Sequence, residues 1–161
     1  MLLPLGEGAT MGAVEGTLRS AYDLTDMAEG EHVDEFTAKE LGNLGELIAA
    51  SYLDHRGYEV LEQGYRCPEG EADLIAYDPD EDVIVLVEVK TRRVHEPCSA
   101  EPEAAVDRRK RERYRRIASC YLMDRFPVLS LRFDVIGISV TSETEAIIEH
   151  YFDVFAWEAD R

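Results

Sequence analysis

The sequence predicts an α/β fold: a helix, three strands in an antiparallel meander, a second helix and two further strands. Short β-branched runs bounded by Gly or by Asp-Pro-Asp, at residues 70–77 and 83–90, are typical of strands. Apolar side chains recur at helical spacing in residues 37–56 and 103–125. The 161 residues suit one domain with a sizeable core.

Residues 1–36 are predicted to be an acidic, mostly disordered N-terminal extension, and residues 37–161 to be the folded domain. The extension is rich in Gly, Ala, Thr and acids, and Arg19 is its one basic residue. A short helix near residues 15–27 is the only element we expect there. A solvated extension is favoured over a partner-binding arm.

The first helix is predicted from a capping box, Thr37-Ala38-Lys39-Glu40, and ends at Gly57. Small residues at Gly42 and Ala49 would let a strand approach Glu46. Glu46 is therefore a candidate for pointing into a site, and an exposed helix acid is the equal alternative. The apolar stripe of this helix comprises Leu41, Leu44, Ile48 and Tyr52.

Strands are also predicted at residues 58–62, 131–140 and 146–155, with loops at 63–69 and 94–101. Asp134 and His150 lie inside the last two strands. A single histidine in a strand is more often a packed or surface residue than a ligand. His150 is therefore a weak candidate, and His55 and His95 are weaker.

Charged residues interrupt two of the apolar strands, which is costly unless something compensates them. Alternation puts Glu88 and Lys90 on one strand face and residues such as Val85 and Val87 on the other. A hairpin centred on Pro79-Asp80 places Asp73 opposite Val87, to within about one residue. Two carboxylates and an ammonium group would then converge at one end of the hairpin.

Such a cluster suits a hard divalent cation, because Mg²⁺ is commonly held by one or two carboxylates plus water and phosphate oxygens. Mn²⁺ suits the same ligands. Lys90 would position a water molecule or stabilise negative charge on a phosphate. The alternative is a structural ion pair that closes the hairpin end.

The formal net charge of -17 argues against nucleic acid as a partner, but the basic residues are concentrated. Ten of the 17 lysines and arginines lie in residues 90–93 and 108–116. In the second segment Glu112 is the only acid among seven cations. We expect phosphate contact there rather than a merely solvated face. Tyr114 would stack on a base or simply pack.

Cysteine usage and the chain start predict a cytoplasmic protein. Cys67, Cys98 and Cys120 are odd in number and lack C-x-x-C spacing, which indicates neither a disulfide framework nor a zinc site. The start, Met1-Leu2-Leu3-Pro4, is not a signal peptide. No apolar run approaches the ~18 residues that span a membrane, so no membrane partner is expected.

Asp73 and Glu88-Val89-Lys90 on consecutive strands resemble the PD-(D/E)xK nuclease superfamily, which has the restriction-endonuclease-like fold with a mixed central sheet flanked by helices. Residues 40–157 more closely resemble the YraN family of bacterial proteins. The extension lies outside this resemblance. The matching segments include Gly45-Glu46, Tyr52-Leu53, Gly57-Tyr58, Gly70-Glu71-Ala72-Asp73-Leu74-Ile75-Ala76, Val87-Glu88-Val89-Lys90-Thr91-Arg92 and Arg132-Phe133-Asp134-Val135-Ile136.

The resemblance implies Mg²⁺-dependent phosphodiester hydrolysis. Asp73, Glu88 and the Val89 carbonyl would bind the metal, Lys90 would orient or activate the attacking water, and Glu46 would support the site. Ala72 stands where the superfamily name has Pro, a position that varies. The residues implied or expected to contact the nucleic-acid backbone are Arg66, Arg92, Arg108, Arg109, Lys110 and Arg113.

The sequence therefore predicts a metal-dependent nuclease, with DNA favoured over RNA, in a role of the processing, repair or recombination type. One alternative is a non-catalytic nucleic-acid-binding module with the same fold. Another is a protein-interaction adaptor that uses the acidic surface and the extension. A homodimer would suit cutting of two strands, although no segment demands it.

Overall fold

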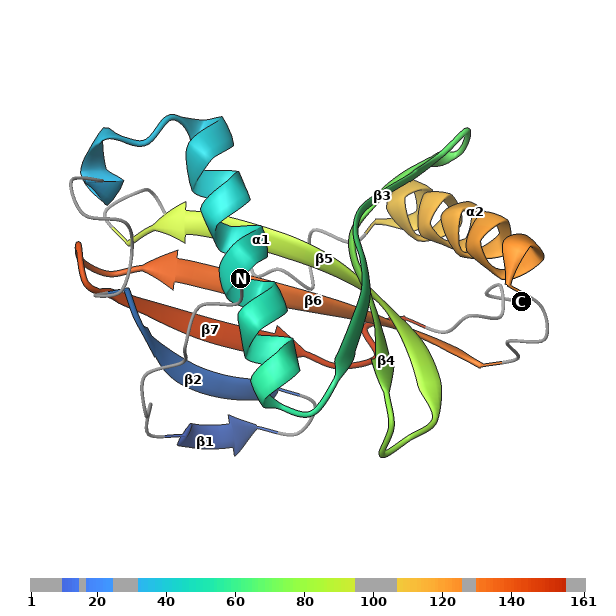
Figure 1. Cartoon of the computed structure of the whole chain (residues 1–161), viewed down its shortest axis with the longest axis horizontal. Helices are drawn as coiled ribbons and strands as arrows, with labels where there is room; N and C mark the ends of the chain where they lie inside the picture. The colour runs from blue at the N-terminus through green and yellow to red at the C-terminus, as the bar shows by residue number, and fades with distance from the viewer. Residues whose placement is uncertain (1–9, 15–16, 25–31, 95–106, 126–129, 156–161) are drawn as a thin grey trace.

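In the computed structural model, one seven-stranded sheet has the order β1-β2-β7-β6-β5-β4-β3, and two helices pack on it (Figure 1). The structure describes residues 10–14, 17–24, 32–94, 107–125 and 130–155. The elements are β1 (Thr10–Val14), β2 (Thr17–Asp23), the 3-10 helix η1 (Val33–Glu35), α1 (Ala38–His55), β3 (Glu59–Cys67), β4 (Gly70–Asp78), β5 (Val83–Arg93), α2 (Arg108–Asp124), β6 (Leu131–Val140) and β7 (Glu145–Tyr151).

The α/β class and the order of elements after residue 36 are confirmed. Strands β3, β4 and β5 form the expected antiparallel meander. The chain then passes through α2 before β6, which allows β5 and β6 to pair in parallel. Strand β7 returns antiparallel to β6 and completes a mixed sheet.

The N-terminal prediction is wrong where the structure describes that segment. Residues 17–23 form β2, which pairs with β7 along its length, and not part of a helix. Tyr22 and Leu24 are buried in the core, so this stretch is not a disordered extension. Its pairing partner is β7, more than 100 residues away, and no local pattern predicts such a pairing. Residues 1–9, 15–16 and 25–31 lie outside the described residues.

Helix α1 begins and ends as predicted. Thr37 Oγ1 accepts from the Glu40 N–H at 3.2 Å, and the Glu40 carboxylate accepts from the Thr37 N–H at 2.9 Å. Gly57 follows the helix with a φ of 88°, a conformation that favours glycine. The predicted apolar stripe is buried.

The close approach of α1 to the sheet occurs at Gly45 rather than at Gly42. A Cβ atom on Gly45 would lie 1.7 Å from Thr91 Oγ1 of β5, whereas a Cβ on Gly42 would have nothing within 4 Å. The sequence therefore predicted a close helix–strand approach correctly but assigned it to the wrong glycine. Because Gly45 immediately precedes Glu46, this contact sets where Glu46 enters the structure.

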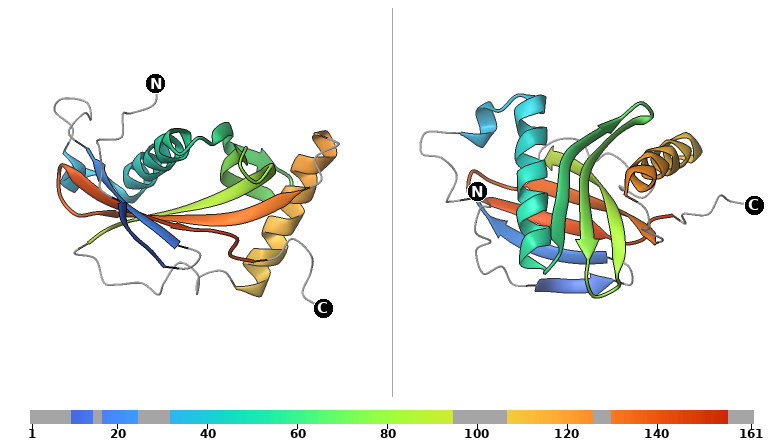
Figure 2. Two further views of the ribbon diagram at one scale, coloured as in Figure 1. Left: turned by 90° about the horizontal axis from the view of Figure 1, so that it is seen from below. Right: turned by 45° about the vertical axis from the view of Figure 1, so that its right-hand side comes forward.

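Both faces of the central strands are covered, as Figure 2 (left) shows, with α1 above the sheet and α2 across its right-hand end. Val85 and Val87 of β5 pack in the core beneath α1, as predicted from their alternation. Ile84 and Leu86 point the other way and pack with Ile117 of α2 and its neighbours. Glu88 continues this second row of side chains and so emerges beside α2.

Three predicted boundaries differ from the structure. Strand β3 continues through Cys67, so Arg66 lies on a strand and not in a loop. Strand β7 ends at Tyr151 and not at 155. Helix α2 is described from Arg108, with Asp107 as its N-cap; the predicted loop over the site and the helix start near residue 103 fall largely within residues 95–106, outside the described residues.

Candidate metal and phosphate site

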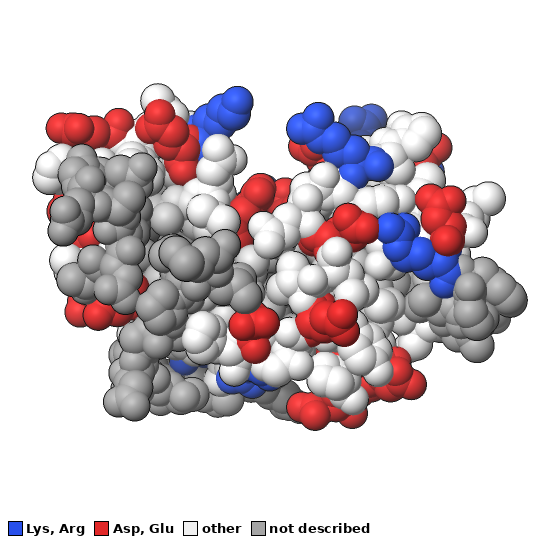
Figure 3. Space-filling view, in the orientation of Figure 1, with Lys and Arg blue, Asp and Glu red and all other residues white. Residues whose placement is uncertain are grey.

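The candidate site forms where β4 separates from β5. The two strands pair from Asp78↔Val83 to Leu74↔Val87, while β5 continues to Arg93 paired with β6 alone. Asp73 therefore lies just past the last pair, one residue from the predicted register. We call this opening the fork. In Figure 3 the surface is notched between α1 and the β3–β4 hairpin, with acidic atoms at the floor of the notch.

Beyond Leu74, β4 no longer pairs with β5, and the Asp73 side chain takes up a β5 backbone hydrogen bond. Asp73 Oδ2 accepts a hydrogen bond from the Val89 N–H at 2.8 Å. The N–H and the C=O of one strand residue point to the same edge. The Val89 carbonyl therefore also faces the fork, as expected of a group that the sequence resemblance assigns to metal binding.

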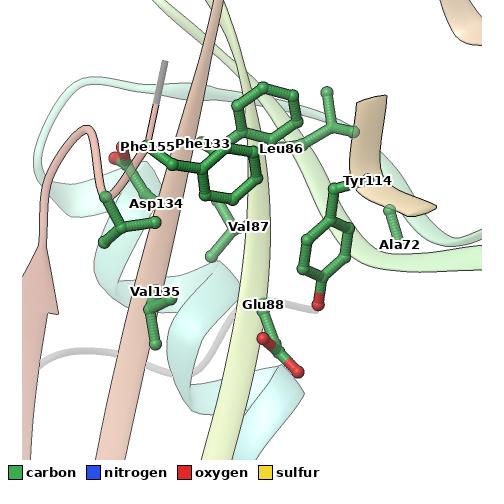
Figure 4. A pocket seen from close by; sticks show the side chains of 10 residues that line it. Ala72, Leu86, Val87, Glu88, Tyr114, Phe133, Asp134, Val135 and Phe155 are labelled. Atoms are coloured by element: carbon green, nitrogen blue, oxygen red, sulfur yellow. The ribbon is translucent and has the colours of Figure 1, made fainter. Parts of the chain in front are cut away.

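Glu88 is almost enclosed, with 10% of its side chain exposed, and its Oε1 accepts from Lys110 Nζ at 2.6 Å and Lys90 Nζ at 3.1 Å. The Tyr114 side chain points toward this carboxylate (Figure 4). Burial raises the pKa of Glu88, but Lys110, Tyr114 and Lys90 outweigh it and hold the pKa below its usual value. Glu88 Oε2 is buried, and no hydrogen-bond partner for it occurs among the described residues.

Lys90 is a cation at neutral pH. Burial lowers its pKa, but the charge and hydrogen bond of Glu88, with a contribution from the charge of Asp73, raise it above its ordinary value. In this state the ammonium group donates hydrogen bonds, which suits the predicted role of orienting a water molecule.

Glu46 of α1 reaches the fork from the opposite side and meets Asp73. Burial raises the pKa of Glu46, and the charge of Asp73 and a hydrogen bond with it raise it further. Burial also raises the pKa of Asp73; the Val89 N–H opposes this and the charge of Glu88 adds to it. Glu46 is thus partly buried beside Asp73 and is not a fully exposed helix acid. The cluster of Glu46, Asp73, Glu88, Lys90 and Lys110, the fork cluster below, thus holds negative charge that its cations leave incompletely balanced.

These residues fit a divalent cation held by few protein ligands. Among the described residues, no three His, Cys, Asp or Glu side chains converge as a metal-binding group. Two carboxylates, Asp73 and Glu88, with the Val89 carbonyl and water would form the ligand set that Mg²⁺ commonly takes. The unpartnered Glu88 Oε2 and the raised pKa of Asp73 are both relieved by a cation at that position.

A rigid aromatic wall holds Tyr114 in place. Phe133 and Phe155 stack with their ring centres 4.3 Å apart, and Tyr114 stacks on Phe155 at 6.2 Å. Together with Ala72 and Glu88, these rings border an enclosed cavity of about 10 Å³ (Figure 4). That volume suits about one water molecule and no substrate, so Tyr114 packs and does not present its face to a base.

An open groove of about 650 Å³ lies beside the fork, between the β3–β4 turn and the first turns of α2. Lys110 lines it and also contacts Glu88, which makes the groove and the fork cluster neighbours. Four cations and three acids contribute to its walls: Arg109, Lys110, Arg113, Arg116, Glu69, Asp107 and Glu112. We call it the α2 groove.

Three of the six residues expected to contact the nucleic-acid backbone line the α2 groove and three do not. Arg109, Lys110 and Arg113 line the α2 groove. The other three lie outside that lining: Arg66 pairs with Glu71 on exposed β3–β4 surface, Arg92 donates to Ser139 at 3.2 Å, and Arg108 pairs with Glu112. Lys110, expected on an open surface, is instead largely enclosed, with 16% of its side chain exposed.

A second charged cluster, which the sequence did not reveal, is buried under the C-terminal end of α1. Arg132 donates to Asp134, Asp78 and the Tyr58 hydroxyl at 2.9–3.0 Å. His150 Nε2 lies 2.7 Å from Asp134 and its Nδ1 lies 3.0 Å from the Tyr52 hydroxyl. We call these residues the Arg132 network. One pair of this network could have been predicted from the sequence, because Arg132 and Asp134 are two residues apart and so share one face of a strand. His150 is a packed residue, as expected.

Comparison with known proteins places most of the described chain in one family. The model of "Uncharacterised protein family UPF0102" matches residues 45–138, which contain Glu46, the fork strands and Lys110. A UPF0102 protein of Moorella thermoacetica is 43% identical over 103 residues, 63% of this chain and 82% of that protein. One of Syntrophus aciditrophicus is 45% identical over 103 residues, 63% and 78%, and one of Geotalea uraniireducens is 39% identical over 123 residues, 76% and 94%. Within the described residues, none of the helices is long and apolar enough to cross a membrane.

Proposed function

This chain belongs to the uncharacterised protein family UPF0102, the YraN family, and we propose that its fork is the active site of a metal-dependent nuclease acting on DNA. The observation that carries the proposal is the convergence of Asp73 and Glu88 on an unpaired strand edge, with a buried Glu88 oxygen that finds no hydrogen-bond partner among the residues that the structure describes. The meander, the crossover through α2 and this fork are what a restriction-endonuclease-like fold requires, and we propose that fold here.

In this proposal Asp73, Glu88 and the Val89 carbonyl would hold Mg²⁺ or Mn²⁺, which would supply Lewis-acid chemistry at the phosphate. Lys90 donates a hydrogen bond to the attacking water or to charge developing on the phosphate. Glu46 lies next to Asp73 and supports the site. Arg109 and Arg113 bind flanking phosphates, since guanidinium groups match phosphate geometry.

The test is cleavage of labelled single-stranded, duplex and branched DNA with Mg²⁺ or Mn²⁺. We expect cleavage by the wild-type chain to require a divalent metal, and Asp73→Asn or Lys90→Met to reduce it by about a hundredfold or more. Glu59→Gln, an exposed acid on β3, is the matched control and should retain full cleavage. Equal cleavage by all four proteins would reject the fork as the active site.

The α2 groove supports a second candidate function, nucleic-acid binding without turnover. Arg109 and Arg113 line this groove and neither contributes to the fork cluster. This candidate predicts salt-dependent binding of DNA that is lost in Arg109→Glu/Arg113→Glu and unchanged in Asp73→Asn. Binding together with an absence of cleavage under every divalent metal would favour it over the nuclease. Cytoplasmic location and a homodimer remain predictions of the sequence alone.

A further inference from the structure

Lys110 occupies an unusual position for a residue in a run of basic side chains. Its side chain is 16% exposed and its ammonium group lies 2.6 Å from Glu88 Oε1, whereas the Arg108 side chain is 87% exposed. The same oxygen already accepts from Lys90. One carboxylate oxygen therefore holds two ammonium groups, while the other oxygen of Glu88 holds none.

Two neighbouring ammonium groups repel each other, so this arrangement is stable only beside surplus negative charge. Asp73, whose Oδ2 accepts from the Val89 N–H, and Glu46 of α1 bring the carboxylates of the fork cluster to three, against two ammonium groups. A divalent cation between Asp73 and Glu88 would remove this surplus. Three cationic groups would then share one site, and their repulsion would favour departure of an ammonium group from Glu88.

Lys90, with 49% of its side chain exposed, already borders solvent where it stands, whereas Lys110 is enclosed and lines the α2 groove. The Lys110 side chain lies at the boundary between Glu88 and the α2 groove, whose wall also contains Arg109, Arg113 and Arg116. A lysine carries its charge on a flexible four-carbon stem, so its ammonium group can move between the two positions without movement of the helix.

We propose that Lys110 is an exchangeable counter-ion of Glu88: it is bound in the metal-free protein and released into the α2 groove when a divalent metal binds. The released ammonium group then contacts phosphate, so that metal and nucleic acid each strengthen the binding of the other. By linkage the two enhancements are equal. This inference rests on the proposed metal site and adds to it a coupling between metal and substrate.

The direct test observes the lysine ammonium groups by ¹⁵N nuclear magnetic resonance, which is favourable because the sequence has three lysines, Lys39, Lys90 and Lys110. In the metal-free full-length protein we expect a Lys110 Nζ signal protected from exchange with water, identified by its loss in Lys110→Met. Saturation with Mg²⁺ should remove the protection. Retained protection at saturation would overturn the proposal.

The second test is calorimetric titration with Mn²⁺, with and without a short single-stranded DNA. Lys110→Met should bind Mn²⁺ at least threefold more tightly than wild type when DNA is absent, because no counter-ion has to leave. In the same variant, DNA should enhance Mn²⁺ binding less than in wild type. Lys39→Met, an exposed lysine on α1, should behave as wild type in both titrations.

The outcomes separate this inference from the nuclease proposal. Release of Lys110 on metal binding without cleavage of any DNA would retain the counter-ion and reject the nuclease. Metal-dependent cleavage with Lys110 still protected, or with weaker Mn²⁺ binding in Lys110→Met, would retain the nuclease and reject the counter-ion. An absence of Mn²⁺ binding in wild type and in Lys110→Met, with DNA present, would reject both.

Discussion

The fork cluster and the Arg132 network are built from the same kinds of side chain but balance their charges differently. Arg132 donates five hydrogen bonds, and the carboxylates of Asp78 and Asp134 are both taken up by this and neighbouring donors. In the fork cluster Glu88 Oε2 has no described partner, and Glu46 lies against Asp73. A satisfied network stabilises a fold, whereas an unsatisfied one is a candidate for ligand binding.

Asp73 and Glu46 of the fork cluster should respond to acid with the opposite sign to the Arg132 network, whereas Glu88, whose pKa is lowered, should respond as that network does. The pKa of Asp134 is lowered because His150 and Arg132 outweigh the effect of burial, and burial lowers the pKa of His150 more than Asp134 raises it. These groups bind fewer protons folded than unfolded, so their contribution to stability is lost as pH falls. Asp73 and Glu46 have raised pKa values and bind more protons folded, so acid favours the folded state there.

The largest effect is expected from breaking the Arg132 network. Arg132→Met leaves Asp78 and Asp134 without their cation in the core, and we expect a loss of about 3–5 kcal/mol in the free energy of unfolding. Urea denaturation measures it. The exposed pair of Arg66 and Glu71 is the control, and Arg66→Ala should cost less than about 1 kcal/mol. Equal losses in the two variants would contradict the distinction between buried and exposed pairs.

Gly45→Ala tests how the fork cluster is positioned. The added Cβ would overlap Thr91, so α1 must move from β5, at a cost of about 1–3 kcal/mol. Gly42→Ala, three residues earlier in the same helix, has free space and should be neutral or stabilising by up to about 1 kcal/mol. Thr91→Ala should partly rescue Gly45→Ala. Thermal unfolding of the four variants decides this, and a neutral Gly45→Ala would show that the helix is not held there.

His150 sharpens the pH contrast with a smaller effect. As pH falls through the ordinary histidine value of about 6.5, the unfolded chain takes up a proton that the folded network resists. The free energy of unfolding should therefore decrease from about pH 7 to pH 5. His150→Gln should flatten that slope. Urea denaturation over this range measures it, and an unchanged slope in the variant would assign the acid sensitivity to other groups.

The smallest effect is expected at Asp73. Asp73→Asn removes a carboxylate that faces Glu46 and Glu88 while its amide oxygen still accepts from Val89. The metal-free protein should become more stable near neutral pH by less than about 1 kcal/mol. Wild type should gain thermal stability on addition of Mg²⁺, and the variant should not. A destabilised Asp73→Asn that still responds to Mg²⁺ would make the fork cluster a structural network like that of Arg132.

The sequence predicted best those features that are encoded locally. The capping box at Thr37 located the start of α1, and the alternation of residues 131–140 located β6 with both boundaries correct. The fork cluster was predicted in part, because strand alternation and a short turn bring Asp73 close to Glu88. Its register was one residue off, since hairpin pairing depends on turn geometry that composition does not specify.

Features that depend on distant segments were missed. Strand β2 is stabilised by pairing with β7, and its own residues have no strong strand pattern. The inward position of Lys110 depends on how α2 is rotated against the sheet, and a run of basic residues does not indicate which one faces Glu88. The Arg132 network joins residues from α1, β4, β6 and β7, so the spacing of Arg132 and Asp134 could show only one pair of it.

The pairing of β2 with β7 also has a consequence for the order of events during synthesis. Tyr22 pairs with Ala146, 124 positions later, so β2 leaves the ribosome long before its partner β7 exists. At about 5–20 residues per second, Tyr22 and Leu24 wait roughly 6–25 s with their apolar surfaces uncovered. During this interval β2 would be exposed to chaperones. β2 can join the sheet only after β7, in the last quarter of the chain, has been made.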